Sequence, residues 1–315
     1  MNREQLFEIL KYNLRQMSLQ EFAGIFINKP KAIEEFYKLC HDIKGGNTIS
    51  LLFNPHRLST STCVNHESVY SSLQSDRLLS GLARLYLYNL EHGITNPLYS
   101  SIQRGFQNVQ YVNEFPPIVA RTIYKRFLNL DEPVEVLDPC AGWGGRMIGA
   151  ASLGISYTAC EPCTETYSGL IELGNWLKVF APKFNFDLFK VPYEDFKSDK
   201  LFDFALTSPP YYDTEHYSDE ETNSFNRYKT LDDWVNGFFE PLIVNTVNRL
   251  KDDGKFVLNI GDRKYNLSSY AESICAKNGF YIERIDDYLA GNGENREKFY
   301  CISKQPCSFK TINLF

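Results

Sequence analysis

Short apolar segments alternate with helical patterns along the second part of the chain, from residue 116 onward. Continuously apolar strands separated by helices are typical of a parallel sheet that helices cover on both faces. The expected strands are VEVLD, ISYTAC, FDLFKV, FDFALTS, KFVLNI, FYIERIDDYL and KFYCISK. The last two are joined by AGNGENRE, whose Asn292-Gly293 pair is typical of a turn, so we expect a C-terminal antiparallel hairpin. This pattern predicts an α/β fold with a mostly parallel sheet.

The first part of the chain has a different pattern, in which apolar residues recur at helical spacing. The residues that do so are Leu6, Ile9, Leu10, Leu14 and Met17; Ile33, Phe36, Tyr37 and Cys40; and Leu78, Leu82, Leu85 and Tyr86. Between them, residues 54–68 form a polar, turn-rich loop that contains His56, Cys63 and His66. We therefore divide the chain into a helical region, 1–112, and an α/β domain, 113–315.

Composition and charge narrow the classes of function. The 33 Lys and Arg residues are outnumbered by 39 Asp and Glu, so the net charge is −6 and a protein that coats nucleic acid by charge alone is not expected. No run of about 18 apolar residues is present, so we expect no membrane span, and the charged N-terminus favours a cytoplasmic location. The eight cysteines are scattered, as reduced thiols usually are, and the single CxxC at Cys160 and Cys163 cannot complete a four-ligand metal site. We expect no metal.

Chemically distinctive residues follow four successive strands of the predicted sheet. Asp138 ends the first strand and leads into a turn crowded with Gly142, Gly144 and Gly145. The other three strand ends present Glu161, then Glu194-Asp195, then Ser208-Pro209-Pro210-Tyr211. Ligands of open α/β sheets bind beyond the carboxyl ends of the strands, so we expect these groups to meet in one site.

Two of these motifs, DPCAGWGG and SPPY, resemble those of the S-adenosylmethionine-dependent amino-methyltransferases that modify exocyclic amines of DNA bases. The segment NEFPPIVARTIYKRF, just before the first motif, resembles the family segment that packs on the methionine end of the cofactor. The resemblance covers residues 113–304, and SPPY is its specific part. It implies a Rossmann-like methyltransferase sheet that uses S-adenosylmethionine.

The resemblance also implies which residues bind the cofactor. Glu161 would bind the ribose hydroxyls, and Asp195, or less securely Glu194, would read the adenine. The methionine portion would lie against the glycine loop and the residues before it, namely Phe115, Pro116, Asp138, Pro139, Cys140, Ala141, Gly142 and Gly144.

The SPPY loop is the catalytic segment that the resemblance implies. Ser208 and the carbonyl of Pro209 would accept hydrogen bonds from the target amino group, and Tyr211 would stack on the base. An aromatic amine is a poor nucleophile because its lone pair is delocalised into the ring. Two acceptors on a loop stiffened by Pro209 and Pro210 would favour the geometry in which that lone pair points at the methyl carbon. The base would have to leave the duplex to reach this loop.

Several readings stay open for the target. Duplex DNA is the favoured partner, as in restriction-modification systems, and Ser208 slightly favours cytosine N4 over adenine N6. An RNA or a single strand is the alternative, because the balance of charge is acidic and no separate recognition domain is visible. A catalytically silent methyltransferase-like binding subunit is the alternative of another class. The chemistry of cytosine-C5 enzymes is not expected, since Cys140 belongs to the glycine loop and no Gln follows it.

Two regions depart from the family pattern. The helical region 1–112 is a candidate for target recognition or for assembly into a homo-oligomer. The acidic segment 212–230 is placed as a lid, yet its carboxylates would repel phosphate. The expected phosphate contacts are Arg263, Lys264, Arg284, Arg296 and Lys298.

Overall fold

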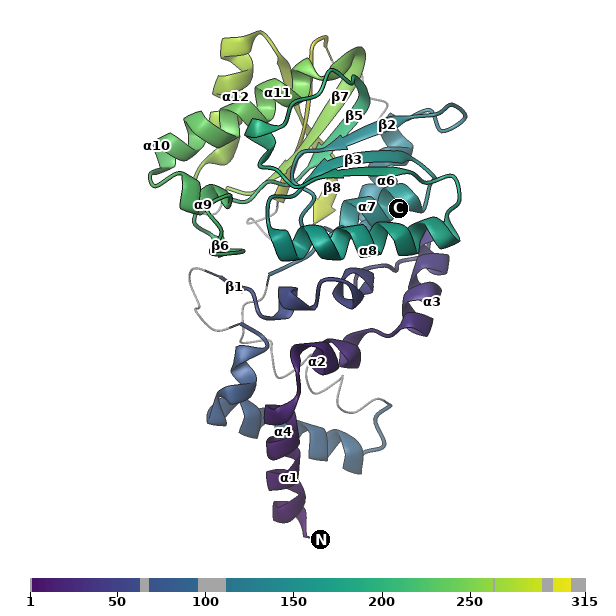
Figure 1. Ribbon diagram of the computed structural model, residues 1–315, viewed down its shortest axis with the longest axis vertical. Coiled ribbons are helices and arrows are strands. Elements are labelled where there is room, and N and C mark those ends of the chain that lie inside the picture. The colour runs from purple at the N-terminus through teal and green to yellow at the C-terminus, as the bar shows by residue number, and fades with distance from the viewer. Residues whose placement is uncertain (1, 63–67, 96–111, 263, 291–296, 307–315) are drawn as a thin grey trace.

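The computed structural model of this chain describes residues 2–62, 68–95, 112–262, 264–290 and 297–306. Seven strands form one sheet in the order β4-β3-β2-β5-β7-β9-β8 (Figure 1). They span Glu135–Asp138 (β2), Ser156–Cys160 (β3), Phe186–Phe189 (β4), Phe202–Thr207 (β5), Leu250–Ile260 (β7), Tyr281–Ala290 (β8) and Glu297–Ser303 (β9). Strand β9 runs antiparallel to both of its neighbours, β7 and β8, and the other pairs are parallel. The predicted α/β fold, a mostly parallel Rossmann-like sheet with a C-terminal antiparallel hairpin behind a helical N-terminal region, is confirmed.

Helices cover both faces of the sheet (Figure 1). One face packs against α6 (Pro117–Phe127), α7 (Gly145–Ala151) and α8 (Thr164–Phe180), and the other against α10 (Leu231–Trp234), α11 (Glu240–Asn248) and α12 (Leu267–Asn278). A π-helical turn, η6 (Val235–Phe239), joins α10 to α11. Alternation along β5 divides the core, because Phe204 and Leu206 face the first set of helices and Ala205 faces the second. Burial on both faces explains why the central strands β2, β3 and β5 read as continuous apolar runs.

The N-terminal region is built from α1 (Arg3–Gln16), α2 (Leu19–Phe26), α3 (Lys29–Cys40) and α4 (Asp76–Glu91). Three short 3₁₀ turns lie between α3 and α4, namely η1 (Ile49–Leu52), η2 (Pro55–Leu58) and η3 (Ser71–Gln74). The predicted helices begin at real caps, since Asn2 and Ser18 each form a capping box that satisfies free N–H groups of the first turn.

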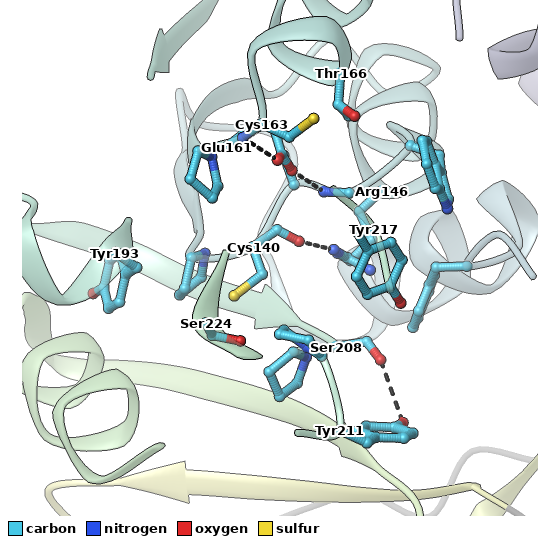
Figure 2. Close-up of a pocket in the computed structure, with 18 of the residues that line it drawn as sticks. Cys140, Arg146, Glu161, Cys163, Thr166, Tyr193, Ser208, Tyr211, Tyr217 and Ser224 are labelled. Carbon is cyan, nitrogen blue, oxygen red and sulfur yellow. Dashed lines mark hydrogen bonds between the residues drawn. The ribbon is translucent and has the colours of Figure 1, made fainter. Parts of the chain in front are cut away.

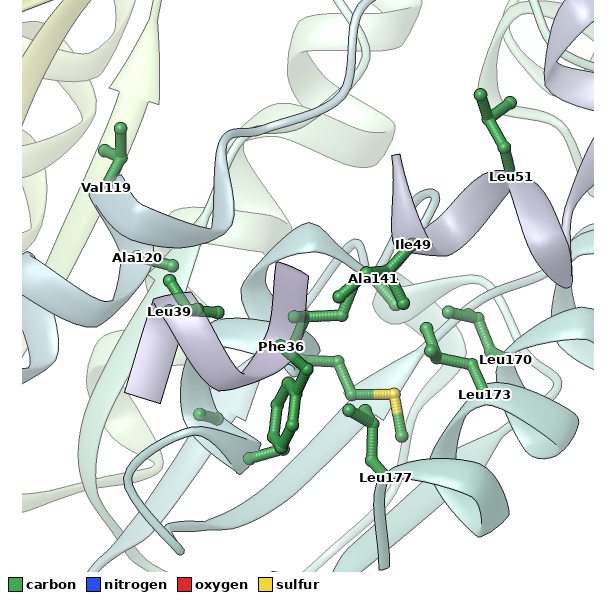
Figure 3. Packing of buried hydrophobic residues seen from close by; sticks show 14 of the residues in the cluster. Phe36, Leu39, Ile49, Leu51, Val119, Ala120, Ala141, Leu170, Leu173 and Leu177 are labelled. Atoms are coloured by element: carbon green, nitrogen blue, oxygen red, sulfur yellow. The ribbon is translucent and has the colours of Figure 1, made fainter. Parts of the chain in front are cut away.

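The N-terminal region shares its hydrophobic core with the α/β part of the chain. Figure 3 shows Phe36 and Leu39 from α3 beside residues of α6 and α8, and Phe36 meets the ring of Trp176 on α8 edge-on at 5.9 Å. Ile49 from η1 packs into the same cluster. Helices α1 and α4 pack on each other at the far end of the region (Figure 1). Residues around 36–58 therefore lie directly against the part of the fold that carries the site.

Candidate active site

A cavity opens beyond the carboxyl ends of β2, β3, β5 and β7 (Figure 2). The predicted site residues that line it are Phe115, Pro116, Pro139, Cys140, Ala141, Gly142, Glu161, Ser208, Pro209, Pro210 and Tyr211. In Figure 2, Ser208 and Tyr211 lie on one side of the cavity, and Glu161 and Thr166 lie on the opposite side. The structure thus brings the predicted strand-end motifs together, but it places Asp138, Gly144 and Asp195 outside the lining.

Asp138 lies behind the wall of the cavity rather than in it, which corrects its predicted contact with the cofactor. Its side chain is fully buried. One carboxylate oxygen accepts from Nε of Arg146 at 2.7 Å and from the hydroxyl of Tyr157. The other accepts from Oγ1 of Thr207 at 2.8 Å and from the backbone N–H of Cys140 at 3.2 Å. Both oxygens are occupied by protein donors, so Asp138 acts by holding the loop and Arg146 in place.

Gly144 serves the packing of the glycine loop and does not face the cavity. Its φ is +98°, in the left-handed region, and a Cβ there would lie 2.6 Å from a methyl of Leu173 on α8. Only glycine allows this turn to sit so close to the helix. Gly142 has φ +56° and donates its N–H to Glu161. Gly142 therefore holds an acidic side chain of the cavity, whereas Gly144 allows close packing on α8.

Glu194, and not its neighbour Asp195, is the acid that faces the cavity from the turn η5 (Tyr193–Asp195) after β4. The Asp195 side chain is 48% exposed and pairs with Arg227 at 2.7 Å, whereas that of Glu194 is 6% exposed. One oxygen of Glu194 accepts from Arg227 and from the hydroxyl of Tyr228, and the other, Oε2, has no partner among the described residues. Burial raises the pKa of Glu194.

Glu161 is held rigidly at the end of β3. Its Oε1 accepts from the N–H of Cys163 at 3.0 Å, and its Oε2 accepts from the N–H of Gly142 at 3.1 Å. Loss of hydration raises the pKa of this carboxyl to about 7, although the two backbone N–H groups oppose the shift.

We expect Glu161 to make the stability of the protein depend on pH. With a pKa of about 7 when folded and 4.5 ordinarily, the folded state holds this proton to higher pH than the unfolded state, so stability falls as pH rises between those values. From pH 5 to pH 8 the wild type should lose on the order of 2 kcal/mol relative to Glu161→Gln. Urea unfolding at both pH values measures the difference. Glu172→Gln, at an exposed position of α8, is the control, and an equal response in both variants would contradict the assignment.

The SPPY loop continues directly from buried β5. Thr207 is fully buried and its hydroxyl bonds Asp138, which ties the end of β5 to the glycine loop. The hydroxyls of Ser208 and Tyr211 lie 3.4 Å apart, as the dashed line in Figure 2 marks. Tyr212 then turns inward with φ +56° and packs against Trp234 at 5.9 Å between ring centres. The buried residues on both sides of the loop fix the position of Ser208 through Tyr211.

The acidic segment after this loop folds over the cavity, with Thr214, Tyr217 and Ser218 among the lining residues. Two of its acids, Asp213 and Glu220, bond to protein groups, whereas the side chain of Asp219 is 99% exposed. The carboxylate of Glu220 accepts from the backbone N–H of Thr164 at 2.8 Å and from its hydroxyl at 2.9 Å, which caps α8. Asp213 accepts from the hydroxyl of Tyr265 at 3.0 Å and pairs with Lys264. These pairs lessen the repulsion of phosphate that the sequence suggested.

Ser50, His56 and Arg57 of the N-terminal region lie behind the wall of the cavity and hold residues that line it, which the sequence did not reveal. Arg57 and Ser50 hold one oxygen of Glu114, a buried residue of the cavity lining, and leave its Oε1 without a partner among the described residues. His56 is buried rather than a polar loop residue, with Nε2 2.9 Å from the hydroxyl of Thr166.

The N-terminal region also pairs with the acidic segment. Strand β1 (Ser61–Thr62) forms a two-stranded antiparallel sheet with β6 (Glu215–His216) of the acidic segment. The position of the acidic segment and that of the N-terminal region are therefore linked through this pairing.

Several predicted contacts have a different outcome. Lys264 and Lys298 pair with Asp213 and Asp262, so they are not bare phosphate contacts in this structure. Some residues of the sequence hypotheses lie outside the described residues, namely Cys63, His66, Arg263, Arg296 and the predicted turn at Asn292-Gly293. Within the described ranges, no three His, Cys, Asp or Glu side chains are grouped so that they could hold a metal ion. No helix in the described part of the chain has both the length and the hydrophobicity needed to cross a membrane.

No protein-family model matches this chain. No curated protein matches it.

Solved structures of S-adenosylmethionine-dependent methyltransferases are similar to it. The glycopeptide N-methyltransferase MtfA in complex with S-adenosyl-L-methionine is 14% identical, with a TM-score of 0.44 over 60% of this chain and 87% of that one. A precorrin-6y C5,15-methyltransferase from Geobacter metallireducens is 16% identical, with a TM-score of 0.40 over 60% and 88%. A TehB-like methyltransferase from Corynebacterium glutamicum is 14% identical, with a TM-score of 0.39 over 66% and 96%. These values are low, so the fold rests on the strand order above and the function on the site itself.

Proposed function

We propose that this chain transfers a methyl group from S-adenosylmethionine to the exocyclic amino group of a nucleobase. The observation that carries the proposal is a set of buried carboxylates spread along one cavity that opens onto the SPPY loop. Two of them, Glu114 and Glu194, each keep one oxygen without a protein donor among the described residues. A buried acceptor without a partner is rare in native proteins and points to a donor on a ligand.

The donor groups of S-adenosylmethionine fit these acceptors. Glu114 would accept from the α-ammonium group, Glu161 from the ribose hydroxyls and Glu194 from the adenine amino group. Their order along the sheet, from the glycine loop to the end of β4, is the order of those groups along the cofactor. Arg146 lines the cavity, and its guanidinium lies over the ring of Phe115 at 5.1 Å. This guanidinium would provide a positive charge for the carboxylate of the cofactor.

The bound cofactor supplies an electrophilic methyl group with a neutral thioether as leaving group. The chain's own task is to orient the accepting amine. Ser208 and the Pro209 carbonyl, on a loop fixed by buried Thr207 and Tyr212, would accept the two N–H bonds of the amine and turn its lone pair away from the ring. Tyr211 would stack on the base. No strong base is needed, because the amine loses its proton only after it has been methylated.

Duplex DNA with a flipped base is the substrate we favour, with cytosine N4 ahead of adenine N6. The support is the resemblance of SPPY and the glycine loop to the DNA amino-methyltransferases. RNA or a single strand is the second candidate, favoured by the net charge of −6 and by the ion pairs that occupy Lys264 and Lys298.

One assay tests the proposal. Purified protein is incubated with methyl-labelled S-adenosylmethionine and, separately, duplex DNA, single-stranded DNA and RNA, and the digested nucleosides are identified by mass spectrometry. We expect N4-methylcytosine or N6-methyladenine from the duplex. Label confined to RNA or single strands would move the proposal to the second candidate. Calorimetry without nucleic acid is the companion measurement, and absence of cofactor binding there would overturn the proposal.

A further inference from the structure

An amide side chain interrupts the buried apolar strand β7 where that strand borders the SPPY loop. Asn259 follows Val257 and Leu258 and precedes Ile260, and it is only 1% exposed. Strands β5 and β7 are parallel, and Thr207 is paired with Leu258. The next position on each strand therefore places Ser208 beside Asn259, and both residues line the cavity.

The hydrogen bonds of Asn259 identify its two amide atoms. Its Nδ2 donates to the backbone carbonyl of Lys298 at 3.2 Å, and a carbonyl can only accept, so this atom must be the nitrogen. The oxygen, Oδ1, is buried and has no hydrogen-bond partner among the described residues. Nearly all buried polar atoms in native proteins are paired, so the oxygen calls for a donor that the protein does not supply.

Three residues of the cavity lining keep a buried side-chain oxygen without a described partner, namely Glu114, Glu194 and Asn259. The proposed cofactor accounts for the two glutamates through its ammonium and adenine amino groups. Asn259 lies on β7, beside Ser208 and opposite Phe299 on β9, where the methyl-accepting molecule would enter. Phe299 also lines the cavity, and its ring meets that of Phe115 edge-on at 6.2 Å.

We propose that Oδ1 of Asn259 accepts a hydrogen bond from the methyl-accepting molecule, as a third acceptor beside Ser208 and the Pro209 carbonyl. The donor is an N–H of a planar aromatic amine, either on the reacting amino group or on the ring next to it. Asn259 is then a specificity-determining residue for the second substrate and has no part in binding the cofactor. This inference rests on the proposed function.

Two variants of Asn259 separate this role from a structural one. Asn259→Ala removes both the oxygen and the donor to Lys298, whereas Asn259→Asp keeps an acceptor and loses the donor. We expect kcat/KM for the methyl acceptor to fall about tenfold in Asn259→Ala, the effect of one lost hydrogen bond. Asn259→Asp should retain more of the activity. The calorimetric affinity for S-adenosylmethionine should stay within about twofold of wild type in both, since no donor of the cofactor is assigned to Asn259.

The same measurements distinguish the ways in which the inference can fail. Equal losses in both variants would mean that the bond to Lys298 is what matters, and wild-type kcat/KM in Asn259→Ala would overturn the role outright. If the wild type neither binds S-adenosylmethionine nor labels any nucleic acid, the proposed function has failed and this inference falls with it. Asn248→Ala, at an exposed position of α11, controls for the substitution itself. Thermal melting of each variant identifies one that has not folded, in which case Asn259→Ser, which restores a smaller acceptor, replaces it.

Discussion

Replacing Asp138 with asparagine is expected to lower the free energy of unfolding by about 3 to 5 kcal/mol, the usual loss when one member of a buried ion pair is removed. The Arg146 side chain is 4% exposed and would be left as a buried cation facing an amide. The hydroxyls of Tyr157 and Thr207 would lose a charged acceptor at the same time. Asparagine keeps the volume of the side chain, so the loss reports on charge and hydrogen bonding rather than on a cavity. Urea unfolding of the two proteins measures it.

The ion pair between Asp76 and Arg15 provides the matched control. The Asp76 side chain is 79% exposed, and Asp76→Asn should change the free energy of unfolding far less than Asp138→Asn does, because solvent screens an exposed pair. The affinity for the cofactor separates a positioning role of Asp138 from a direct contact with the cofactor. If Asp138 contacted the cofactor directly, as the sequence predicted, Asp138→Asn would lose cofactor affinity while its unfolding free energy stayed close to wild type. That result would reject the positioning role.

The sheet could be predicted because its central strands are buried on both faces. Segments between the expected strands fold as helices, among them α8 (Thr164–Phe180) and α12 (Leu267–Asn278), and Gly279 in the left-handed conformation ends the second. The boundary of β7 was less predictable. The apolar pattern KFVLNI suggests a start at Lys255, but the strand begins at Leu250. Leu250 pairs with Phe202 of β5, the register then shifts, and pairing resumes at Lys255.

The sequence also predicted that four strand ends converge, but not the direction in which each side chain points. Asp138 and Glu161 both lie at strand ends, but only Glu161 lines the cavity. Asp138 lies behind the wall, where both of its carboxylate oxygens accept hydrogen bonds from the protein. Glu194 and Asp195 are neighbours on one short turn, and only their contacts with Arg227 and Tyr228 decide which is buried. Orientation at a strand end depends on tertiary packing, which a local motif does not contain.

Contacts between distant segments account for the rest of what the sequence did not predict. His56 meets Thr166 across 110 positions of the chain, and Arg57 meets Glu114 across 57. The polar loop that contains His56 and Arg57 has no motif of its own, so its place behind the wall of the site follows only from the packing of α3 and η1 against α8. The asparagine on β7 was missed for a similar reason, since one amide in an apolar strand has no sequence signature.

Replacing Tyr211 with alanine is expected to lower kcat/KM for the methyl acceptor roughly 10- to 100-fold, because stacking of one base on an aromatic ring contributes about 1 to 3 kcal/mol. Tyr211 lines the cavity beside Ser208, and the buried ring of Tyr212 anchors the loop just after it, so the loop should keep its course without the Tyr211 ring. Affinity for S-adenosylmethionine should stay within about twofold of wild type, since the acceptors assigned to the cofactor lie on other elements. Steady-state transfer of labelled methyl groups and calorimetry give the two quantities separately.

Phenylalanine at the same position separates the ring from the hydroxyl. Tyr211→Phe keeps the stacking face and removes the contact with the hydroxyl of Ser208, which at 3.4 Å is a long hydrogen bond. It should therefore retain most of the wild-type kcat/KM, whereas Tyr211→Ala should not. If both variants lose activity equally, the hydroxyl would be the functional group and Tyr211 would act by orienting Ser208. If Tyr211→Ala turns over at the wild-type rate, no base stacks on this ring and the catalytic role of the SPPY loop would have to be assigned without it.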